Sequence, residues 1–249
     1  MTRLVPHGEP PTHFRFSGLA ALGLPHITTT RHFPGVTASS EPTAPFNADA
    51  RAALRAANLD GARLSYLKQV HGAEALRAPV GGGYAGVGDV LTTTERGVPV
   101  AIFTADCLAI TLWDSIARVL TVAHAGWRGT VKGTPGVAVK AAVQAGARAD
   151  QLHVAIAPSI GPCCYEVDEP VLREFGRAHG RRAQPWFTAG REGHAMLDLW
   201  KANEALLADA GVDRAKIQNP RLCTACHPEL LYSYRKGNRG RLVTVAALP

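Results

Sequence analysis

An α+β sandwich, with residues 1–249 in a single domain, is the fold that the sequence predicts. Candidate strands and helices are intermixed along the chain, without the regular alternation of a doubly wound sheet. The chain has 249 residues, of which 46% are hydrophobic, enough to bury a sizeable core. No repeat, low-complexity segment or linker divides it, so one domain is expected.

The N-terminal part is expected to hold little regular structure. Residues 1–25 are rich in Pro, Thr and His with little periodicity, and they are predicted to form an irregular segment. An edge strand is predicted near His26–Arg31, followed by a long loop through Pro45. A helix is predicted over Asn47–Leu59, because its apolar residues recur at helical spacing and Asn47 can cap it.

Apolar and β-branched runs predict the strands of the sheets. Several of these runs stop abruptly at a polar residue. The predicted strands are Ser65–His71, Val98–Ala105, Ile110–Ala117 (a strand and its turn), Val119–His124, His153–Ala157 and Arg241–Leu248. The glycine-rich segment Gly81–Asp89 is predicted to be a loop.

Three further helices are predicted in the second half of the chain. Thr134–Ala145 has a proline in its first turn, and Asp168–Ala178 has acidic residues near its N-terminus. Leu197–Ala210 is the clearest amphipathic helix, with apolar residues recurring at i, i+3, i+7 and i+11.

The net charge of +7 favours anionic partners. The cations are mostly scattered arginines, without the interleaved aromatics of a nucleic-acid-binding motif, so no nucleic-acid partner is expected. A phosphorylated or phosphate-using small substrate explains the charge as well. No apolar run approaches the ~18 residues that span a bilayer, and no secretory signal is recognised. The sequence therefore predicts a soluble cytoplasmic protein without a membrane partner.

Three local patterns match known site motifs but are interpreted as structural. Gly81-x-Gly83-x-x-Gly86 matches a dinucleotide-binding string, yet a strand-like run follows where the motif requires a helix. Cys223-Thr-Ala-Cys226-His227 matches a haem-attachment pattern, which requires export. The segment around Ser159 lacks the first glycine of a nucleophile elbow and is interpreted as a turn.

Five cysteines, without an export signal, favour reduced thiols over a disulfide framework. A structural zinc site is one alternative for four of them, although two are adjacent in sequence, which is unusual for zinc ligands. These four are Cys163, Cys164, Cys223 and Cys226.

Three metal-binding side chains lie where predicted strands end. His71 ends one strand, Cys107 follows another and His124 ends a third. If the strands are neighbours, two imidazoles and a thiolate meet in one cleft, which is a three-ligand zinc set with a fourth position for water. The structural alternatives are a core histidine, an inert cysteine and a turn histidine.

Two neighbours of these ligands suggest further roles. Asp106 precedes Cys107 and is a candidate to orient a ligand or to transfer protons. Arg128 lies in a glycine-bracketed turn, which suits close approach of an anion, with a surface salt bridge as the alternative.

The strings KQVHG, GDVLTT, TADC, HAGWRG, IGPCCYEV and YSYR resemble the laccase-domain family. Its members were first described as multicopper polyphenol oxidases and later assigned as purine nucleoside phosphorylases. The resemblance spans His26 to about Arg241. It implies an α/β/β/α sandwich and a zinc ion held by His71, Cys107 and His124. It also implies phosphorolysis of adenosine, inosine and methylthioadenosine, together with deamination of adenosine.

The resemblance also indicates substrate contacts. Only Arg31 and Asn47 map onto the family pattern in the divergent segment from Arg31 to Asn47, and Ala109 stands where the family commonly has proline. The expected partners are purine nucleosides and phosphate, and the chain fits a monomer or a homodimer. The cations expected near phosphate are Arg31, Lys68 and Arg128, and further pocket candidates are Ser159, Tyr165 and Arg235.

Three rival functions are kept. A copper-dependent phenol oxidase would need more histidines in paired patterns than this chain offers, although copper can occupy the same three ligands adventitiously. A cysteine hydrolase would use Cys107 as nucleophile, with His71 or His124 as its base. A non-enzymatic nucleotide-binding or partner-binding protein fits the charge but leaves the three polar strand ends unexplained.

Overall fold

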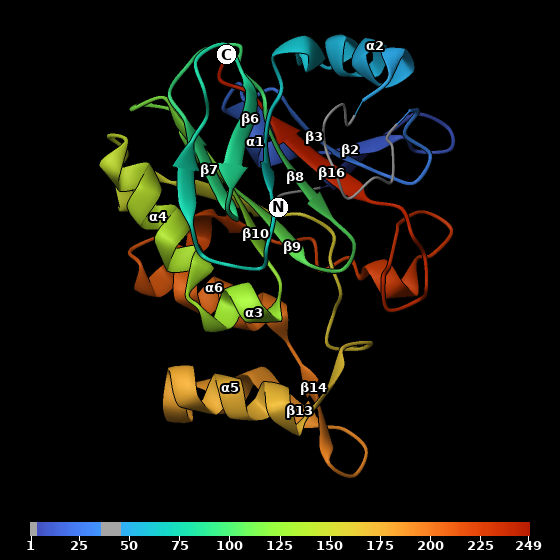
Figure 1. Cartoon of the computed structure of the whole chain (residues 1–249), viewed down its shortest axis with the longest axis vertical. Coiled ribbons are helices and arrows are strands. Elements are labelled where there is room, and N and C mark those ends of the chain that lie inside the picture. The colour runs from blue at the N-terminus through green and yellow to red at the C-terminus, as the bar shows by residue number, and fades with distance from the viewer. Residues whose placement is uncertain (1–3, 36–45) are drawn as a thin grey trace.

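Two large sheets pack face to face, and helices cover both outer sides (Figure 1). The computed structural model describes residues 4–35 and 46–249. The layers follow the order helix, sheet, sheet, helix, and both sheets mix parallel and antiparallel pairs. The predicted α+β sandwich is therefore confirmed, and its sheets are mixed. Its extent as one domain over residues 1–249 stays a prediction.

The first sheet has seven strands within the described residues. Their bounds are Leu4–His7 (β1), His13–Phe16 (β2), His26–Thr29 (β3), Ser65–Lys68 (β4), Gly83–Val87 (β6), Val100–Thr104 (β8) and Leu242–Ala246 (β16). They lie in the order β1-β2-β3-β16-β8-β4-β6. Neighbours from β1 to β8 are antiparallel, whereas β4 runs parallel to both β8 and β6.

The second sheet has six strands in the same described ranges. Their bounds are Ala75–Arg77 (β5), Val90–Thr93 (β7), Leu108–Asp114 (β9), Val119–Ala125 (β10), His153–Ile156 (β11) and Ile217–Gln218 (β15). They lie in the order β15-β11-β9-β10-β7-β5. The central strands β11, β9, β10 and β7 are antiparallel, and the two outer pairs are parallel.

The β9 strand shows how two layers of core are built from one strand. Successive side chains of a strand point to opposite faces. Ala109 and Trp113 therefore point into the core between the two sheets, where they meet Ile102 of β8. Ile110 and Leu112 point the other way, into the core beneath the helices. All seven residues of β9 are buried, which explains its nearly continuous apolar sequence.

Six α-helices lie within the described residues. Their bounds are Ser17–Ala21 (α1), Ala48–Ala56 (α2), Trp127–Val131 (α3), Thr134–Gln144 (α4), Glu169–His179 (α5) and Leu199–Asp209 (α6). The predicted helices over 47–59, 134–145, 168–178 and 197–210 are confirmed as α2, α4, α5 and α6. The side chain of Asn47 caps α2 by accepting a hydrogen bond from the N–H of Ala50 at 3.0 Å.

The helices cover the sheets through their apolar faces. Ala138 and Ala142 of α4, with Leu207 of α6, pack on the outer face of the second sheet. Leu54 of α2 packs on the outer face of the first sheet, against Val243 of β16. Figure 1 shows α3, α4 and α6 together on one side and α2 on the other.

A smaller sheet and α5 form the lower part of the molecule in Figure 1. Its three strands, in the order β12-β14-β13, are Glu166–Asp168 (β12), Phe187–Ala189 (β13) and His194–Leu197 (β14). These short strands are not predicted from the sequence. Phe175 of α5 fixes them by packing edge-on against Trp186 and Phe187, with ring centroids 6.0 and 5.4 Å apart.

The irregular segment predicted for residues 1–25 is wrong. Residues 4–16 form the β1–β2 hairpin and 17–21 form α1, because Phe14, Phe16 and Leu19 are buried against the sandwich. The strand predicted near His26–Arg31 exists as β3 but lies inside the sheet, between β2 and β16. Most of the loop predicted through Pro45 lies outside the described residues.

The loop predicted over Gly81–Asp89 is also wrong. Residues 83–87 form the edge strand β6, paired parallel with β4. Its glycines adopt left-handed backbone angles, with φ of 103° at Gly83 and 123° at Gly86. Backbone hydrogen bonds at a sheet edge need no side-chain pattern, so the residues of this strand show no period that predicts it. In the described residues, no helix is both long and apolar enough to cross a membrane.

Candidate active site

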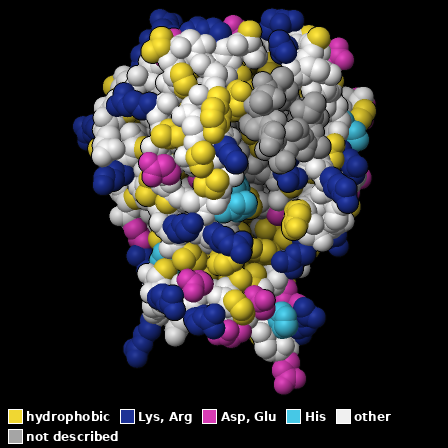
Figure 2. Space-filling model, viewed as in Figure 1, with side chains coloured by type: hydrophobic (Ala, Val, Ile, Leu, Met, Phe, Trp, Pro, Cys, Tyr) yellow, Lys and Arg dark blue, Asp and Glu magenta, His cyan; other side chains and the backbone are white. Residues whose placement is uncertain are grey.

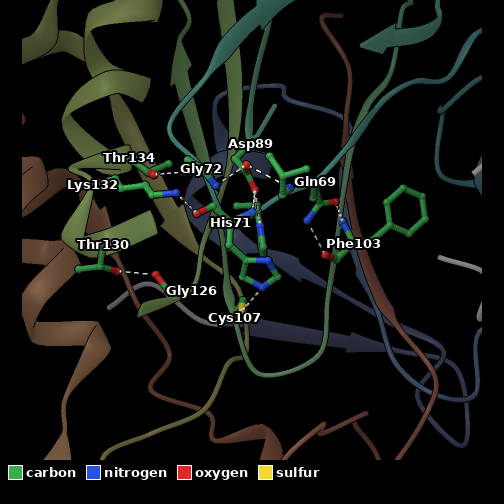
Figure 3. A network of polar contacts seen from close by, with 12 residues as sticks. Gln69, His71, Gly72, Asp89, Phe103, Cys107, Gly126, Thr130, Lys132 and Thr134 are labelled. Atoms are coloured by element: carbon green, nitrogen blue, oxygen red, sulfur yellow. Dashed lines mark hydrogen bonds and ion pairs between the residues drawn. The ribbon is translucent and has the colours of Figure 1, made fainter. Parts of the chain in front are cut away.

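His71, Cys107 and His124 come together in one cluster, and Figure 3 shows His71 and Cys107 facing each other within it. One ligand atom from each side chain lies within 4.8 Å of the other two. The Cys107 Sγ atom is 3.8 Å from His71 Nε2, and the two imidazole rings meet edge-on with centroids 4.7 Å apart. Three segments far apart in sequence thus supply one compact set of donors.

Backbone geometry at two turns aims these side chains. His71 follows β4 and has φ of 57°, and Asp106, between β8 and β9, has φ of 83°. Left-handed angles are uncommon outside glycine and are held in place by surrounding contacts. Gln69 supplies one such contact, because its side-chain amide exchanges two 2.8 Å hydrogen bonds with the backbone of Phe103. The end of β4 is thereby fixed to β8.

Asp89 is the functional residue that the sequence reasoning missed. Its buried carboxylate accepts a 2.7 Å hydrogen bond from His124 Nδ1. It also accepts hydrogen bonds from the backbone N–H groups of Val70, His71 and Gly72, at 3.2, 3.0 and 2.6 Å. One carboxylate therefore orients one imidazole and the turn that carries the other (Figure 3). In the sequence, the glycine before Asp89 and the apolar strand after it are the features that could have indicated a functional carboxylate at this position.

The three donors perturb one another electrostatically. Burial opposes ionisation of Cys107, but hydrogen bonds from His124 and His71 outweigh it and lower the pKa of the thiol to about 6. Burial likewise lowers the pKa of His124, but the hydrogen bonds to Asp89 and Cys107 raise it to about 9. Both shifts favour a thiolate paired with an imidazolium when no metal is bound.

The donor set fits a zinc ion. Two imidazoles and a low-pKa thiolate are ligands that Zn²⁺ prefers, and three protein ligands leave one coordination position open. The Nδ1–H of His124 donates a hydrogen bond to Asp89, so its Nε2 atom is the one left for a metal. Copper also binds such ligands, so the donor chemistry admits both metals.

Gly126 leaves room for this cluster. A Cβ atom at this position would lie 2.7 Å from Cys107 Sγ and 3.2 Å from His71 Cδ2, although the φ of −80° suits any residue. Gly126→Ala is therefore expected to lower metal affinity at least tenfold and to cost about 1–3 kcal/mol of unfolding free energy by overpacking. Metal titration and denaturant unfolding would measure both.

The matched control is Gly136→Ala, at an open position inside α4. This variant should keep full metal affinity and gain roughly 0.5–1 kcal/mol of stability. Unchanged metal binding in Gly126→Ala would contradict the close approach described here.

A cavity of about 630 Å³ opens over the three donors. This volume suits a small-molecule ligand. Apolar and aromatic side chains make up much of its wall: Leu67, Phe103, Trp127, Ile160, Tyr165, Leu199 and Tyr234. In the space-filling view a histidine reaches the surface near the middle of the face, with Lys and Arg side chains around it and apolar side chains close by (Figure 2).

Four cations also line the cavity: Lys68, Arg128, Arg235 and Arg241. The guanidinium of Arg128 lies 4.3 Å from the centre of the Trp127 ring, and that of Arg235 lies 5.2 Å from the Tyr165 ring. Burial raises the pKa of Tyr165 above its ordinary value, so its phenol stays protonated. The cavity thus combines flat apolar surfaces with positive charge.

Asp106 reaches the cavity from the turn before Cys107. Its Oδ1 atom accepts a 2.6 Å hydrogen bond from the Thr224 hydroxyl, and its Oδ2 atom accepts a 2.7 Å hydrogen bond from the N–H of Arg235. The carboxylate thereby holds Arg235 at the cavity wall. Its role in proton transfer stays a prediction.

Three residues considered from sequence lie outside this cavity lining. Arg31 hydrogen-bonds the carbonyl of Pro228 and lies over the ring of Tyr232. The side-chain oxygen of Asn47 caps α2, as described above. Ser159 is buried and accepts a hydrogen bond from Trp200 at 2.7 Å. Their roles as substrate contacts stay predictions, and the structure gives each of them a local structural partner.

Comparison with known proteins identifies relatives of the chain. Residues 38–249 match the family model described as multi-copper polyphenol oxidoreductase laccase. A purine nucleoside phosphorylase of Deinococcus radiodurans is 39% identical over 246 residues, which cover 92% of this chain and 90% of that protein. The adenosine deaminase RL5, from an unknown prokaryotic organism, is 37% identical over 63% of this chain and 60% of its own length.

A solved structure supports the same relationship. The crystal structure of YlmD from Geobacillus stearothermophilus superimposes with a TM-score of 0.84 at 26% sequence identity. The superposition covers 99% of each chain. The similarity therefore extends over the whole sandwich, including the segments that carry the three donors.

Proposed function

The chain belongs to the multi-copper polyphenol oxidoreductase laccase family, and from this premise we propose that it processes purine nucleosides. The reaction proposed is zinc-dependent phosphorolysis of adenosine to adenine and ribose 1-phosphate. Inosine and methylthioadenosine are further substrates, and deamination of adenosine is a side activity. The observation that carries the proposal is the His71–Cys107–His124 donor set at a cavity of about 630 Å³ with aromatic and cationic walls.

The aromatic walls suit the purine base. A purine ring is flat and apolar on its faces, so it packs against rings such as Phe103, Trp127 and Tyr165. The protonated phenol of Tyr165 can donate a hydrogen bond to a ring nitrogen or to a hydroxyl of the sugar. These residues bind and orient the nucleoside.

The cationic walls suit phosphate. In phosphorolysis the bond between the sugar C1′ atom and the base nitrogen breaks, and a phosphate oxygen bonds to C1′. Arg128 and Lys68 can hold the phosphate close to C1′ and offset its charge. The departing base must gain a proton, for which Asp106 is the candidate group among the cavity residues.

Zinc would be held by His71, Cys107 and His124, and when bound it supplies Lewis-acid catalysis. Asp89 orients the imidazole of His124 and the turn that carries His71, so that both histidines are in place before a metal binds. The apolar wall of the cavity limits water around the reacting groups.

The test is product analysis with adenosine, with and without phosphate, on protein whose zinc content has been measured. We expect adenine that appears only when phosphate is present. Inosine formed without any phosphate requirement would make the protein chiefly a deaminase. No turnover of adenosine by the zinc-loaded protein would overturn the proposal.

A cysteine hydrolase is the second candidate, because two neighbouring histidines lower the pKa of the Cys107 thiol to about 6. The lowered pKa predicts that, in metal-free protein, alkylation of Cys107 rises with pH around a midpoint near 6, rather than near the ordinary value of 9.0. Bound zinc should block this alkylation. Peptide mapping after iodoacetamide treatment over a pH series would measure both effects.

Activity after metal removal separates the two candidates. A hydrolase that uses Cys107 keeps its activity without metal and loses it on alkylation. A zinc-dependent phosphorylase loses its activity with the metal and regains it when zinc is restored. An alkylation midpoint near pH 9 would contradict the thiolate assignment for either candidate.

A copper phenol oxidase is less favoured by the ligand groups present. Within residues 4–35 and 46–249, two groups of three or more His, Cys, Asp or Glu side chains could hold a metal. One is the His71–Cys107–His124 set and the other consists of four cysteines. Copper bound adventitiously at the first set would explain weak oxidation of phenols.

A further inference from the structure

Four cysteines converge at a second place in the fold. The Sγ atoms of Cys163, Cys164, Cys223 and Cys226 all lie within 4.8 Å of one another. Cys226 Sγ is 3.5 Å from Cys163 Sγ and 3.4 Å from Cys164 Sγ. All four cysteines are free thiols. The function proposed above does not use this cluster.

Backbone pairing holds the two segments that carry these cysteines side by side. The N–H of Ser159 donates to the carbonyl of Leu222 at 3.2 Å, and the N–H of Thr224 donates to the carbonyl of Ser159 at 3.1 Å. Trp200 of α6 fixes the first segment by donating a 2.7 Å hydrogen bond to the Ser159 hydroxyl. The positions of the sulfurs therefore follow from the packing of the fold.

Packing at Gly161 adds to this rigidity. A Cβ atom there would lie 2.5 Å from the ring of Trp200, so the chain passes directly over the indole on its way to Cys163. The N–H of Gly161 donates to Cys223 Sγ at 3.2 Å. Backbone N–H groups aimed at sulfur stabilise negative charge on it, which is the form of cysteine that binds a metal.

We propose that these four cysteines form a second metal site, one that binds Zn²⁺ through four thiolates and is structural. In a tetrahedral site with Zn–S bonds of about 2.3 Å, neighbouring sulfurs lie about 3.8 Å apart. Two of the observed Sγ separations are 3.5 and 3.4 Å, and all of them lie within 4.8 Å, so a small adjustment of the side chains accommodates the ion. Binding releases the proton of each thiol that coordinates the ion.

A disulfide explains the cluster less well. A disulfide joins two sulfurs at about 2.05 Å, so Cys226 could pair with Cys163 or with Cys164 but not with both. Two thiols would then stay beside the bond without a partner. A single ion satisfies all four sulfurs at once. Cys223-x-x-Cys226, which spans the short 3₁₀ helix Thr224–Cys226, also has a ligand spacing typical of zinc sites.

The ion would stabilise one wall of the cavity. Thr224 lies between Cys223 and Cys226 in sequence. Its hydroxyl group donates a 2.6 Å hydrogen bond to Asp106 Oδ1. The N–H of Ile160 donates to the carbonyl of Asp106 at 2.8 Å. Ile160, Tyr165 and Asp106 all line the cavity. Zinc at the four cysteines would therefore tie both segments to the turn that precedes Cys107.

Metal analysis of the full chain, purified without chelators, tests the proposal. Wild-type protein is expected to carry about two zinc ions per chain. Cys226→Ser should carry about one, because it loses a ligand of the second site only. His124→Ala should also carry about one, because it loses a ligand of the first site only. His227→Ala, next to Cys226, is the matched control and should keep both ions.

Cobalt substitution gives a second readout that does not depend on activity. In the His124→Ala background, bound Co²⁺ should show strong thiolate-to-cobalt charge-transfer absorption. Adding the exposed substitution Cys163→Ser or Cys226→Ser should lower the cobalt affinity by at least tenfold, while circular dichroism confirms that the chain is folded. Two exposed positions are used because replacement of the buried Cys223 could disturb folding.

Three results would overturn the proposal. The first is one zinc per wild-type chain that is lost in His124→Ala and kept in Cys226→Ser. The second is a Cys226 disulfide in protein purified under anaerobic conditions. The third is iron in place of zinc at the four sulfurs. If instead the His71–Cys107–His124 set bound no zinc, the single ion of the wild-type chain would be lost in Cys226→Ser and kept in His124→Ala. That result would contradict the proposed function and not the second site.

Discussion

His124→Ala is expected to abolish zinc binding at the His71–Cys107–His124 set and to lower kcat/KM for adenosine by a factor of about a thousand or more. The imidazole of His124 is buried, anchored by Asp89 and close to both other donors. Two remaining ligands cannot hold the ion firmly. Zinc content per chain and steady-state kinetics with adenosine and phosphate would measure both losses.

The control for this prediction is His194→Ala. His194 lies in the smaller sheet, outside the cavity lining, so its removal should leave zinc content and kinetics unchanged. The decisive observation is a metal-free His124→Ala protein that is folded. Turnover of adenosine at the wild-type rate by that protein would show that the donor set is not the active site.

Asp89→Asn is expected to have the second-largest effect, on both stability and metal affinity. The carboxylate accepts hydrogen bonds from His124 and from three backbone N–H groups. An asparagine replaces one acceptor oxygen with an NH₂ group, which faces these donors without a partner. We expect a loss of about 2–4 kcal/mol in unfolding free energy and a 10- to 100-fold loss of zinc affinity.

Asp114→Asn is the matched control for Asp89→Asn. Asp114 is also a buried carboxylate that accepts three backbone hydrogen bonds, from Ile116, Ala117 and Arg148. This variant should lose comparable stability in denaturant unfolding and keep full zinc affinity. Equal losses of zinc affinity in the two variants would mean that Asp89 acts through stability alone and has no role in orienting His124.

The helices were predictable because their signals are local. Asn47 as an N-cap, the proline in the first turn of α4 and the apolar spacing of α6 lie within short windows of sequence, and all correspond to observed helices. The N-terminal hairpin was missed because its strands have four residues each, too few to show a period. The edge strand β6 was missed because it contains two glycines, and a glycine-rich segment is typical of a loop.

The donor set was predictable in part. His71, Cys107 and His124 stand where apolar strands end, and the structure brings these strand ends together. The sequence does not reveal which strands are neighbours or which sheet each strand joins. His71 follows β4 and His124 lies in β10, and these two strands belong to different sheets. Asp89 was missed for the same reason, because it is 35 residues from His124 and meets it only through the pairing of β7 with β10.

The sequence by itself determined the identity of the three donors, the helices and the family resemblance, because each depends on residue type and short-range order. Only the tertiary structure decided which carboxylate orients His124, that Arg235 lines the cavity and Arg31 does not, and that four cysteines converge. These features depend on contacts between segments distant in sequence. Such contacts are set by the packing of two sheets, a property that no local window of the chain contains.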